Sequence, residues 1–263
     1  MIMIVKRTVQ LVCLLAAVFT ALFSFHGSSL AADRKLTIAG ASDLSLAFKE
    51  IAREFEKETG YKVTLSLGST GMLARQIEQG APFDAFFAAN RKFVEDLEKG
   101  GHILPGTVEL YAEGRLVIAV KSNAGFKIMK LEDLKDSRVR RIAIANPAHA
   151  PYGLSAMEAL KSAGLWDELK PRLVYGENIR QALQFVEAGN ADAGIIARSI
   201  AIGITGVECV EVPPSLHRPI SQAAGVVSLS KEKDGAKAFI RFVNGPKGSP
   251  IMKKYGFLPP GAR

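Results

Sequence analysis

Short apolar stretches and longer amphipathic stretches follow one another in regular order through residues 34–101. In residues 43–60, apolar side chains recur every three or four positions, as on one face of a helix: Leu44, Phe48, Ile51 and Phe55. Residues 61–69 instead alternate apolar and polar side chains, which is typical of a strand. These two patterns predict strands at 34–42, 61–69 and 83–89, and helices at 43–60, 70–80 and 91–101.

A second series of the same kind begins near residue 113. It predicts strands at 113–120, 140–147, 171–176 and 191–197, with helices at 152–164 and 177–190. After residues 207–215 come a returning strand at 221–230 and two helices, at 234–245 and 249–257. Alternation of strands and helices implies an α/β fold whose sheets are mostly parallel, with helices on both faces. Because no Gly/Ser linker separates the two series, we expect two lobes joined by strands that cross between them.

The first 32 residues have the pattern of a secretory signal peptide. A basic start at Lys6 and Arg7 precedes the apolar run 9–25, and small residues lead to a cleavage site beside Ala31 or Ala32. The alternative is an uncleaved membrane anchor, since about 17 apolar residues approach the length of a span. The signal-peptide interpretation predicts a protein exported to the periplasm.

Composition and charge exclude several other classes. After removal of residues 1–32 the chain has 32 basic and 26 acidic residues, a net charge of +6, and the basic residues are scattered. Nucleic-acid binding would need a basic stripe with interleaved aromatic residues, so we expect no nucleic-acid partner. Cys209 would then be the only cysteine, and His102, His149 and His217 have no ligand-spaced partners. We therefore expect no disulfide within the chain, no metal centre and no cofactor.

Four junctions between a strand and a helix could hold a ligand, at 39–44, 67–72, 146–155 and 175–181. Ligands of open parallel sheets lie beyond the carboxyl ends of the strands. Helix starts there expose unpaired N–H groups with partial positive charge, which suits an anion. The alternative is that their Ser, Thr, Asp and Asn residues only cap the helices. Tyr152 is either a ligand contact or an aromatic residue of the core.

Catalysis has little support in the sequence. There is no G-x-S-x-G motif, and no histidine lies where it would serve a serine. Glu50 and Glu54 are four residues apart on a predicted solvated helix face. Asp84 interrupts an apolar strand, and we expect it to make a structural hydrogen bond within the first lobe.

Three stretches, taken with these junctions, resemble one known family. "GSTGMLARQIEQGAPFDAFFAAN", "IAIANPAHAPYGLSAMEAL" and "ENIRQALQFVEAGNADAGII" are similar to the corresponding segments of the periplasmic molybdate-binding proteins of ABC transporters, which are type II periplasmic binding proteins. The resemblance covers essentially the whole chain after residue 32. It implies two lobes with a ligand cleft between them, and we place the first lobe at 33–112 plus 218–263 and the second at 113–217.

The resemblance also implies a ligand and a set of contacts. The family binds molybdate or tungstate through hydroxyls and backbone N–H groups, and delivers it to a membrane permease. By motif, the contacts fall at Ser42 or Asp43, at Thr70, at Tyr152 and at the backbone N–H of Ile179. Some members add a tyrosine hydroxyl from the last strand. Because Ala197 stands there, we expect Tyr152 to provide the phenol and Gly153 to let the helix start approach closely.

Asp43 departs from the family's pattern, since it stands where commoner members have a ligand serine. A carboxylate ~4 Å from a dianion would be repelled by roughly 8 kcal/mol at an effective dielectric constant of 20. Either Asp43 turns away to cap the helix, leaving Ser42 to supply the hydroxyl, or the ligand is not a bare dianion. We expect the first arrangement.

The sequence therefore predicts a monomeric solute-binding protein rather than an enzyme. Alternatives are the same fold with another oxyanion or a small organic acid as ligand and, less favoured, a secreted enzyme or a sensory domain. Molybdate and tungstate nearly coincide in size and charge, so the sequence does not separate them.

Overall fold

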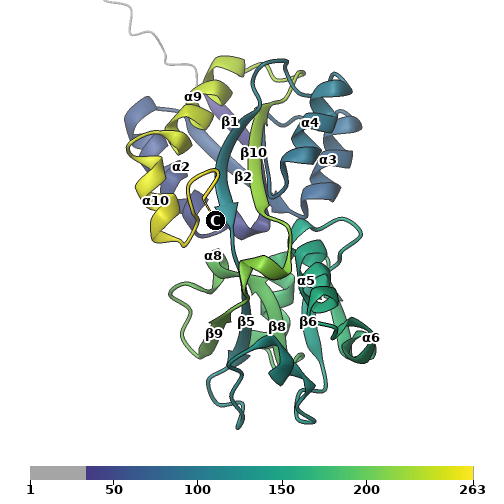
Figure 1. Ribbon diagram of the computed structural model, residues 1–263. Coiled ribbons are helices and arrows are strands. Elements are labelled where there is room, and N and C mark those ends of the chain that lie inside the picture. The colour runs from purple at the N-terminus through teal and green to yellow at the C-terminus, as the bar shows by residue number, and fades with distance from the viewer. Residues whose placement is uncertain (1–33, 263) are drawn as a thin grey trace, which may run out of the picture. The chain divides into compact units, whose positions relative to one another are not determined.

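The computed structural model describes residues 34–262. The predicted signal peptide, residues 1–32, lies outside the described residues. Residues 35–263 form one compact unit, and the fold is that of this unit. It contains two five-stranded sheets, each with its own helices, and the chain passes from one sheet to the other and back (Figure 1).

The first sheet has the strand order β2-β1-β3-β10-β4. Four strands share one direction and β10 opposes them, because β1 pairs in parallel with β2 and β3 while β10 pairs antiparallel with β3 and β4. Its strands are β1 (Lys35–Ala41), β2 (Lys62–Gly68), β3 (Ala85–Ala88), β4 (Glu109–Gly114) and β10 (Ile220–Val226). Its helices are α2 (Ala47–Thr59), α3 (Thr70–Glu78), α4 (Arg91–Lys99), α9 (Lys233–Asn244) and α10 (Gly248–Lys254).

The second sheet repeats this design with the order β7-β6-β8-β5-β9, in which β5 is the opposed strand. Its strands are β5 (Leu116–Lys121), β6 (Ile142–Ala145), β7 (Leu173–Gly176), β8 (Ala193–Ala197) and β9 (Val207–Glu211). Its helices are α5 (Pro151–Ser162), α6 (Trp166–Leu169), α7 (Ile179–Glu187) and α8 (Arg198–Ala201). Short 3₁₀ turns lie at Ser42–Leu44, Leu131–Lys135, Lys170–Arg172 and Pro214–Leu216.

Both faces of the first sheet are covered, as the apolar runs of its strands predict. Phe86 and Phe87 are neighbours in β3 and both are fully buried, but they point to opposite faces. Phe87 packs edge-on against Phe48 of α2, with ring centroids 4.9 Å apart, whereas Phe86 belongs to the core beneath α3 and α4. Figure 1 shows these two helices on one side of the sheet and α2, α9 and α10 on the other.

Two crossings join the sheets. β4 ends at Gly114 and β5 begins at Leu116, so Arg115 alone separates strands of different sheets. The return runs from Glu211 at the end of β9 to Ile220 at the start of β10. The sequence predicted one strand over 113–120, but Glu113 and Gly114 pair with β10 of the first sheet. A continuous apolar pattern does not reveal where a strand changes sheets, because the pattern reports burial and not the partner.

The first predicted helix begins later than its apolar pattern indicates. Residues 42–44 form the 3₁₀ turn, and α2 starts only at Ala47. Gly60 then ends α2 in the left-handed conformation, with φ of 75°. Among residues 34–262, no helix has both the length and the apolar character needed to cross a membrane.

Candidate functional site

A small cavity of about 10 Å³ lies between the two sheets, where strand ends of both meet. β1 and β2 end side by side, with Ala41 opposite Gly68, and β6 and β7 do the same in the other sheet. The four junctions predicted from the sequence all contribute to its wall. So do all five residues predicted as binding residues: Ser42, Asp43, Thr70, Tyr152 and Ile179. Residues more than 100 positions apart are thereby brought around one space.

The first sheet contributes hydroxyl groups. Ser42 follows β1 and Thr70 opens α3, and both are buried. The Thr70 hydroxyl accepts a hydrogen bond from the backbone N–H of Ala89, at 3.1 Å. A hydroxyl that accepts a hydrogen bond in this way keeps its own proton, so the Thr70 hydroxyl can donate to a ligand in the cavity.

The second sheet contributes the starts of two helices. Asn178 caps α7, because its side-chain oxygen accepts from the N–H groups of Arg180 and Gln181 at 3.0 and 3.1 Å. Ile179 precedes those two residues and lines the cavity. Its backbone N–H is left to donate to another acceptor. At α5, Gly153 permits a close approach, since a Cβ there would lie 2.0 Å from the carbonyl oxygen of Ala145. Gly153 thus lets the start of α5 approach the end of β6 closely.

Asp43 belongs to a buried polar cluster at the edge of the cavity. The Gln222 amide nitrogen donates to Asp43 Oδ2 at 2.7 Å and to the Tyr152 hydroxyl at 3.0 Å. The Tyr111 hydroxyl donates to the Gln222 amide oxygen at 2.6 Å, which fixes the orientation of the amide. The expectation that Asp43 caps a helix is wrong. Ala41 holds the cap position of the 3₁₀ turn, and the carboxylate is turned toward Gln222 instead.

Burial sets the electrostatics of this cluster. Removal from water raises the pKa of Asp43 from 3.8 to about 6, although the Gln222 amide, the Tyr152 hydroxyl and nearby backbone N–H groups act in the opposite direction. Burial, together with the negative charge of Asp43, raises the pKa of Tyr111 and of Tyr152 well above 10. Both phenols therefore stay protonated at neutral pH and can donate hydrogen bonds.

A second set of contacts holds the walls of the cavity together, and we call Ser69, Gly71 and His149 the clasp. The Gly71 N–H and the Ser69 hydroxyl, both from the first sheet, donate to the carbonyl oxygen of His149 at 2.9 and 2.8 Å. The His149 ring lies 2.7 Å from the same hydroxyl through Nδ1. On the other side, Ser199 of α8 donates to the carbonyl oxygen of Asp43 at 2.9 Å.

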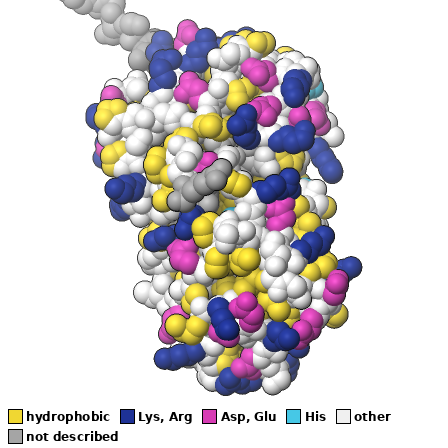
Figure 2. Space-filling view, viewed as in Figure 1, with side chains coloured by type: hydrophobic (Ala, Val, Ile, Leu, Met, Phe, Trp, Pro, Cys, Tyr) yellow, Lys and Arg dark blue, Asp and Glu magenta, His cyan; other side chains and the backbone are white. Residues whose placement is uncertain are grey.

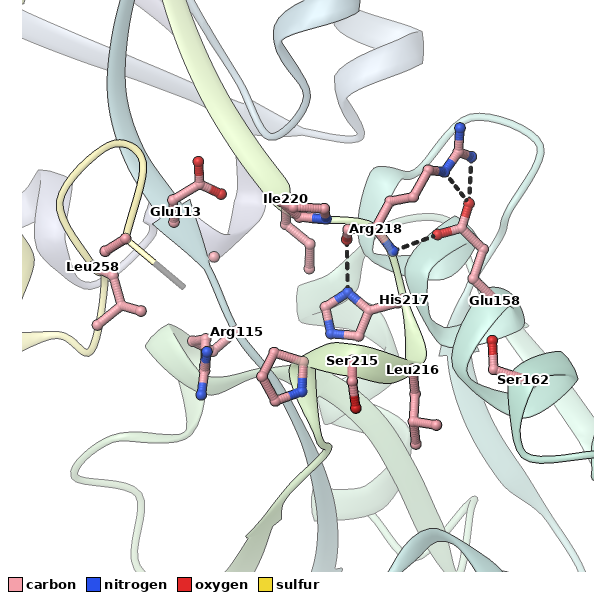
Figure 3. A pocket seen from close by; sticks show the side chains of 14 residues that line it. Glu113, Arg115, Glu158, Ser162, Ser215, Leu216, His217, Arg218, Ile220 and Leu258 are labelled. Atoms are coloured by element: carbon pink, nitrogen blue, oxygen red, sulfur yellow. Dashed lines mark hydrogen bonds and ion pairs between the residues drawn. The ribbon is translucent and has the colours of Figure 1, made fainter.

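A larger hollow, of about 720 Å³, lies beside the crossings (Figure 3). In its wall, Arg218 Nε donates to Glu158 at 2.7 Å, and His217 Nδ1 lies 2.8 Å from the carbonyl oxygen of Arg218. Prolines, Leu216, Ile220 and Leu258 make up much of the rest. This hollow lacks the converging helix starts of the smaller cavity, so we do not take it as the ligand site.

The acidic, histidine and cysteine side chains in the described part of the chain do not gather into a metal centre, and Asp84 has a structural role. No group of three or more His, Cys, Asp or Glu residues there could hold a metal ion. Asp84 has the structural role expected of it, since its carboxylate accepts from the Thr37 N–H at 2.7 Å and from the Ser230 hydroxyl at 2.6 Å. Basic and acidic side chains are interspersed over the face seen in Figure 2, which shows no basic stripe there.

Comparisons with known proteins show the family of this chain. The model of a family described as bacterial extracellular solute-binding proteins matches residues 36–258. The chain belongs to this family. It is 38% identical to the molybdate-binding protein ModA of Azotobacter vinelandii over 226 residues, 85% of this chain and 89% of the relative. The corresponding protein of Rhodobacter capsulatus is 35% identical over 240 residues, 91% of this chain and 94% of the relative.

A solved structure supports the same assignment. The periplasmic molybdate-binding protein of Azotobacter vinelandii superimposes with a TM-score of 0.80 at 34% identity, over 86% of this chain and 99% of that one. The two-lobe α/β fold predicted from the sequence is thus confirmed. Because the family consists of solute-binding transport proteins, it is not an enzyme family.

Several residues around the site of this solute-binding protein were not indicated by the sequence patterns, among them Gln222, His149 and Ser69. Gln222 lies in the middle of a strand. The sequence presented His149 only as a possible metal ligand and Ser69 only as part of a helix start. A polar residue inside the apolar run 220–226 was the one available signal for Gln222, which is fully buried. Ala197, where a tyrosine was considered, is not part of the cavity wall.

Proposed function

We propose that this solute-binding protein captures molybdate or tungstate in the cavity between its two sheets and delivers the anion to an ABC permease. The observation that supports this proposal is the chemical character of the cavity wall. It offers neutral donors, namely the hydroxyls of Ser42, Thr70 and Tyr152 and the N–H groups at the starts of α5 and α7, and it contains no lysine, arginine or histidine.

Such a wall suits a small oxyanion. Each oxygen of a tetrahedral anion can accept several hydrogen bonds, and helix starts provide N–H groups that need an acceptor. Each of the two sheets supplies donors, and neither wall alone surrounds the ligand. The ligand is therefore captured when the two walls close on it. The small volume favours a single inorganic oxyanion over a small organic acid.

The similarity to molybdate-binding proteins supports molybdate as the ligand. Two relatives more than one third identical over most of the chain are named for molybdate. We extend this to tungstate because its size and charge are close to those of molybdate. Sulfate and phosphate are smaller oxyanions and should leave part of the donor set unsatisfied.

Titration calorimetry tests the proposal. A chain beginning at residue 33 retains the whole compact unit. It is titrated with molybdate, tungstate, sulfate and phosphate at equal ionic strength. We expect saturable binding of the first two and at least hundredfold weaker binding of the others. If the chain binds phosphate or sulfate and neither molybdate nor tungstate, the proposed ligand is wrong, but the role as a solute-binding protein stands.

We also infer the cellular setting. The signal-peptide pattern of residues 1–32 and membership of an extracellular family support export to the periplasm, where the chain would act as a monomer without a resident cofactor. Mass spectrometry of the protein recovered from the periplasmic fraction should find a chain that begins near residue 32 or 33. A mass that still includes residues 1–32 would indicate an anchor.

A further inference from the structure

One carboxylate oxygen in the cavity wall has no partner. Asp43 is 1% exposed and lines the cavity, and its Oδ2 is occupied by the Gln222 amide. Its Oδ1 is buried and receives no hydrogen bond from any described residue. A buried carboxylate oxygen without a hydrogen-bond donor is unfavourable. We therefore expect this atom to be protonated or to have a partner in the cavity.

Within residues 34–262, no basic side chain forms an ion pair with Asp43. The titratable groups coupled electrostatically to it are the phenols of Tyr111 from β4 and Tyr152 from α5. Two further helices pack against the turn that carries Asp43, and their arginines are paired elsewhere: Arg180 of α7 with Glu187, and Arg198 of α8 with Glu211. Gln222 of β10 is neutral.

An ionised Asp43 and a dianion in the same cavity are incompatible. At contact distance their repulsion is roughly 8 kcal/mol, even at an effective dielectric constant of 20. One proton placed between a carboxyl oxygen and an anion oxygen removes this repulsion and replaces it with a hydrogen bond between the two.

We propose that the oxyanion is bound together with one proton, which Asp43 Oδ1 shares with an oxygen of the anion. This inference rests on the proposed function and adds a positioning and selectivity role for Asp43. The balance is simple: an ionised carboxylate, a dianion and one proton from solution form a complex with a net charge of −2. When Asp43 is already protonated before binding, no proton is taken up.

The proposal predicts a distinctive pH dependence. In the neutral and alkaline range free molybdate is a dianion, and any proton in the complex must come from the buffer. The molybdate dissociation constant should therefore rise about tenfold per pH unit above the pKa of Asp43 in the free protein, or about hundredfold between pH ~6.5 and ~8.5. Replacement of the carboxyl by an amide should abolish this slope, because the amide donates without titrating.

The experiment is calorimetry of the wild-type chain with molybdate at pH ~8, in two buffers of different ionisation enthalpy, which counts the protons taken up. We expect uptake of about one proton per anion. Asp43→Asn should take up none and should bind more tightly than the wild type at this pH. Ser42→Ala is the matched control, since it removes a neighbouring donor: its binding is weaker, but its proton uptake is unchanged.

The outcomes separate this proposal from the one on which it rests. Tight molybdate binding by the wild type with no proton uptake at pH ~8 would overturn the role of Asp43 and leave the function intact. Equal pH slopes in the wild type and Asp43→Asn would do the same. No molybdate binding by either protein at any pH would overturn the proposed function itself.

Discussion

Gly71 offers the sharpest test of how the cavity is closed. A Cβ at this position would lie 2.8 Å from the carbonyl oxygen of His149 and 3.0 Å from its Cβ. The same carbonyl oxygen accepts from the Gly71 N–H at 2.9 Å, so Gly71→Ala must push the two loops apart and lengthen that bond. The Ser69 hydroxyl, which donates to the same oxygen at 2.8 Å, is displaced with it.

The expected loss follows from these two hydrogen bonds. At about 0.5–1.5 kcal/mol each, the closed state loses about 1–3 kcal/mol relative to the open one. For a protein that is mostly open without ligand, an equal loss appears in binding, so the dissociation constant for molybdate should rise about 5- to 150-fold. Folding stability should not fall, because alanine is a better helix former than glycine by up to about 1 kcal/mol at this position in α3.

Calorimetry with molybdate gives the affinity, and thermal unfolding without ligand gives the stability. Ser69→Ala removes only the hydroxyl and should give a smaller loss of affinity. Gly100→Ala is the control: its φ is −77°, and its closest contact is a His102 ring atom at 3.1 Å, far from the clasp. If Gly71→Ala binds molybdate as tightly as the wild type, the clasp is not part of the binding-competent state and the reasoning is refuted.

Three further outcomes are expected. Tyr152→Phe should weaken molybdate binding by about 1–3 kcal/mol in calorimetry, since a donor to a charged group is lost; unchanged affinity would leave Tyr152 as a packing residue. Asp84→Ala should lower the free energy of unfolding in urea by about 1–3 kcal/mol while affinity is kept, because the Thr37 N–H loses its acceptor; a loss of affinity without a loss of stability would contradict this. The folded-state pKa of Asp43, about 6, lies above the unfolded value of 3.8. Its contribution to stability is therefore fully present below pH ~3.8 and lost as pH rises through ~6, by about 3 kcal/mol. Urea unfolding of the wild type and Asp43→Asn across this range should show their difference in stability changing by that amount, and a constant difference would refute the shift.

Local sequence patterns predicted most of the fold. Apart from the later start of α2, the predicted strands and helices of residues 34–101 and 140–197 lie where the two periodicities place them, because each element buries one face against its own sheet. Helices of four residues, α6 and α8, and the strand β4 were not predicted. Such short elements are held by neighbouring parts of the chain and leave no periodic pattern of their own.

The candidate site was predicted in part. Small and hydroxyl residues at helix starts indicated Ser42, Thr70 and Ile179, since a strand followed by a helix exposes N–H groups whatever the rest of the chain does. The carboxylate of Asp43 was expected to turn away from the ligand and cap the helix. Its actual partner, Gln222, is 179 positions away and meets it only because β10 returns to the first sheet beside β3.

The sequence by itself thus determined the element types, the two-lobe α/β class and the chemistry available at each junction. These depend on interactions between residues close together in the chain. Only the tertiary structure decided that Tyr111, Tyr152 and Gln222 surround one buried carboxyl, and that Ser69 and Gly71 meet His149 across the cavity. Those contacts depend on the two crossings between the sheets, and no local pattern encodes which distant residues a crossing brings together.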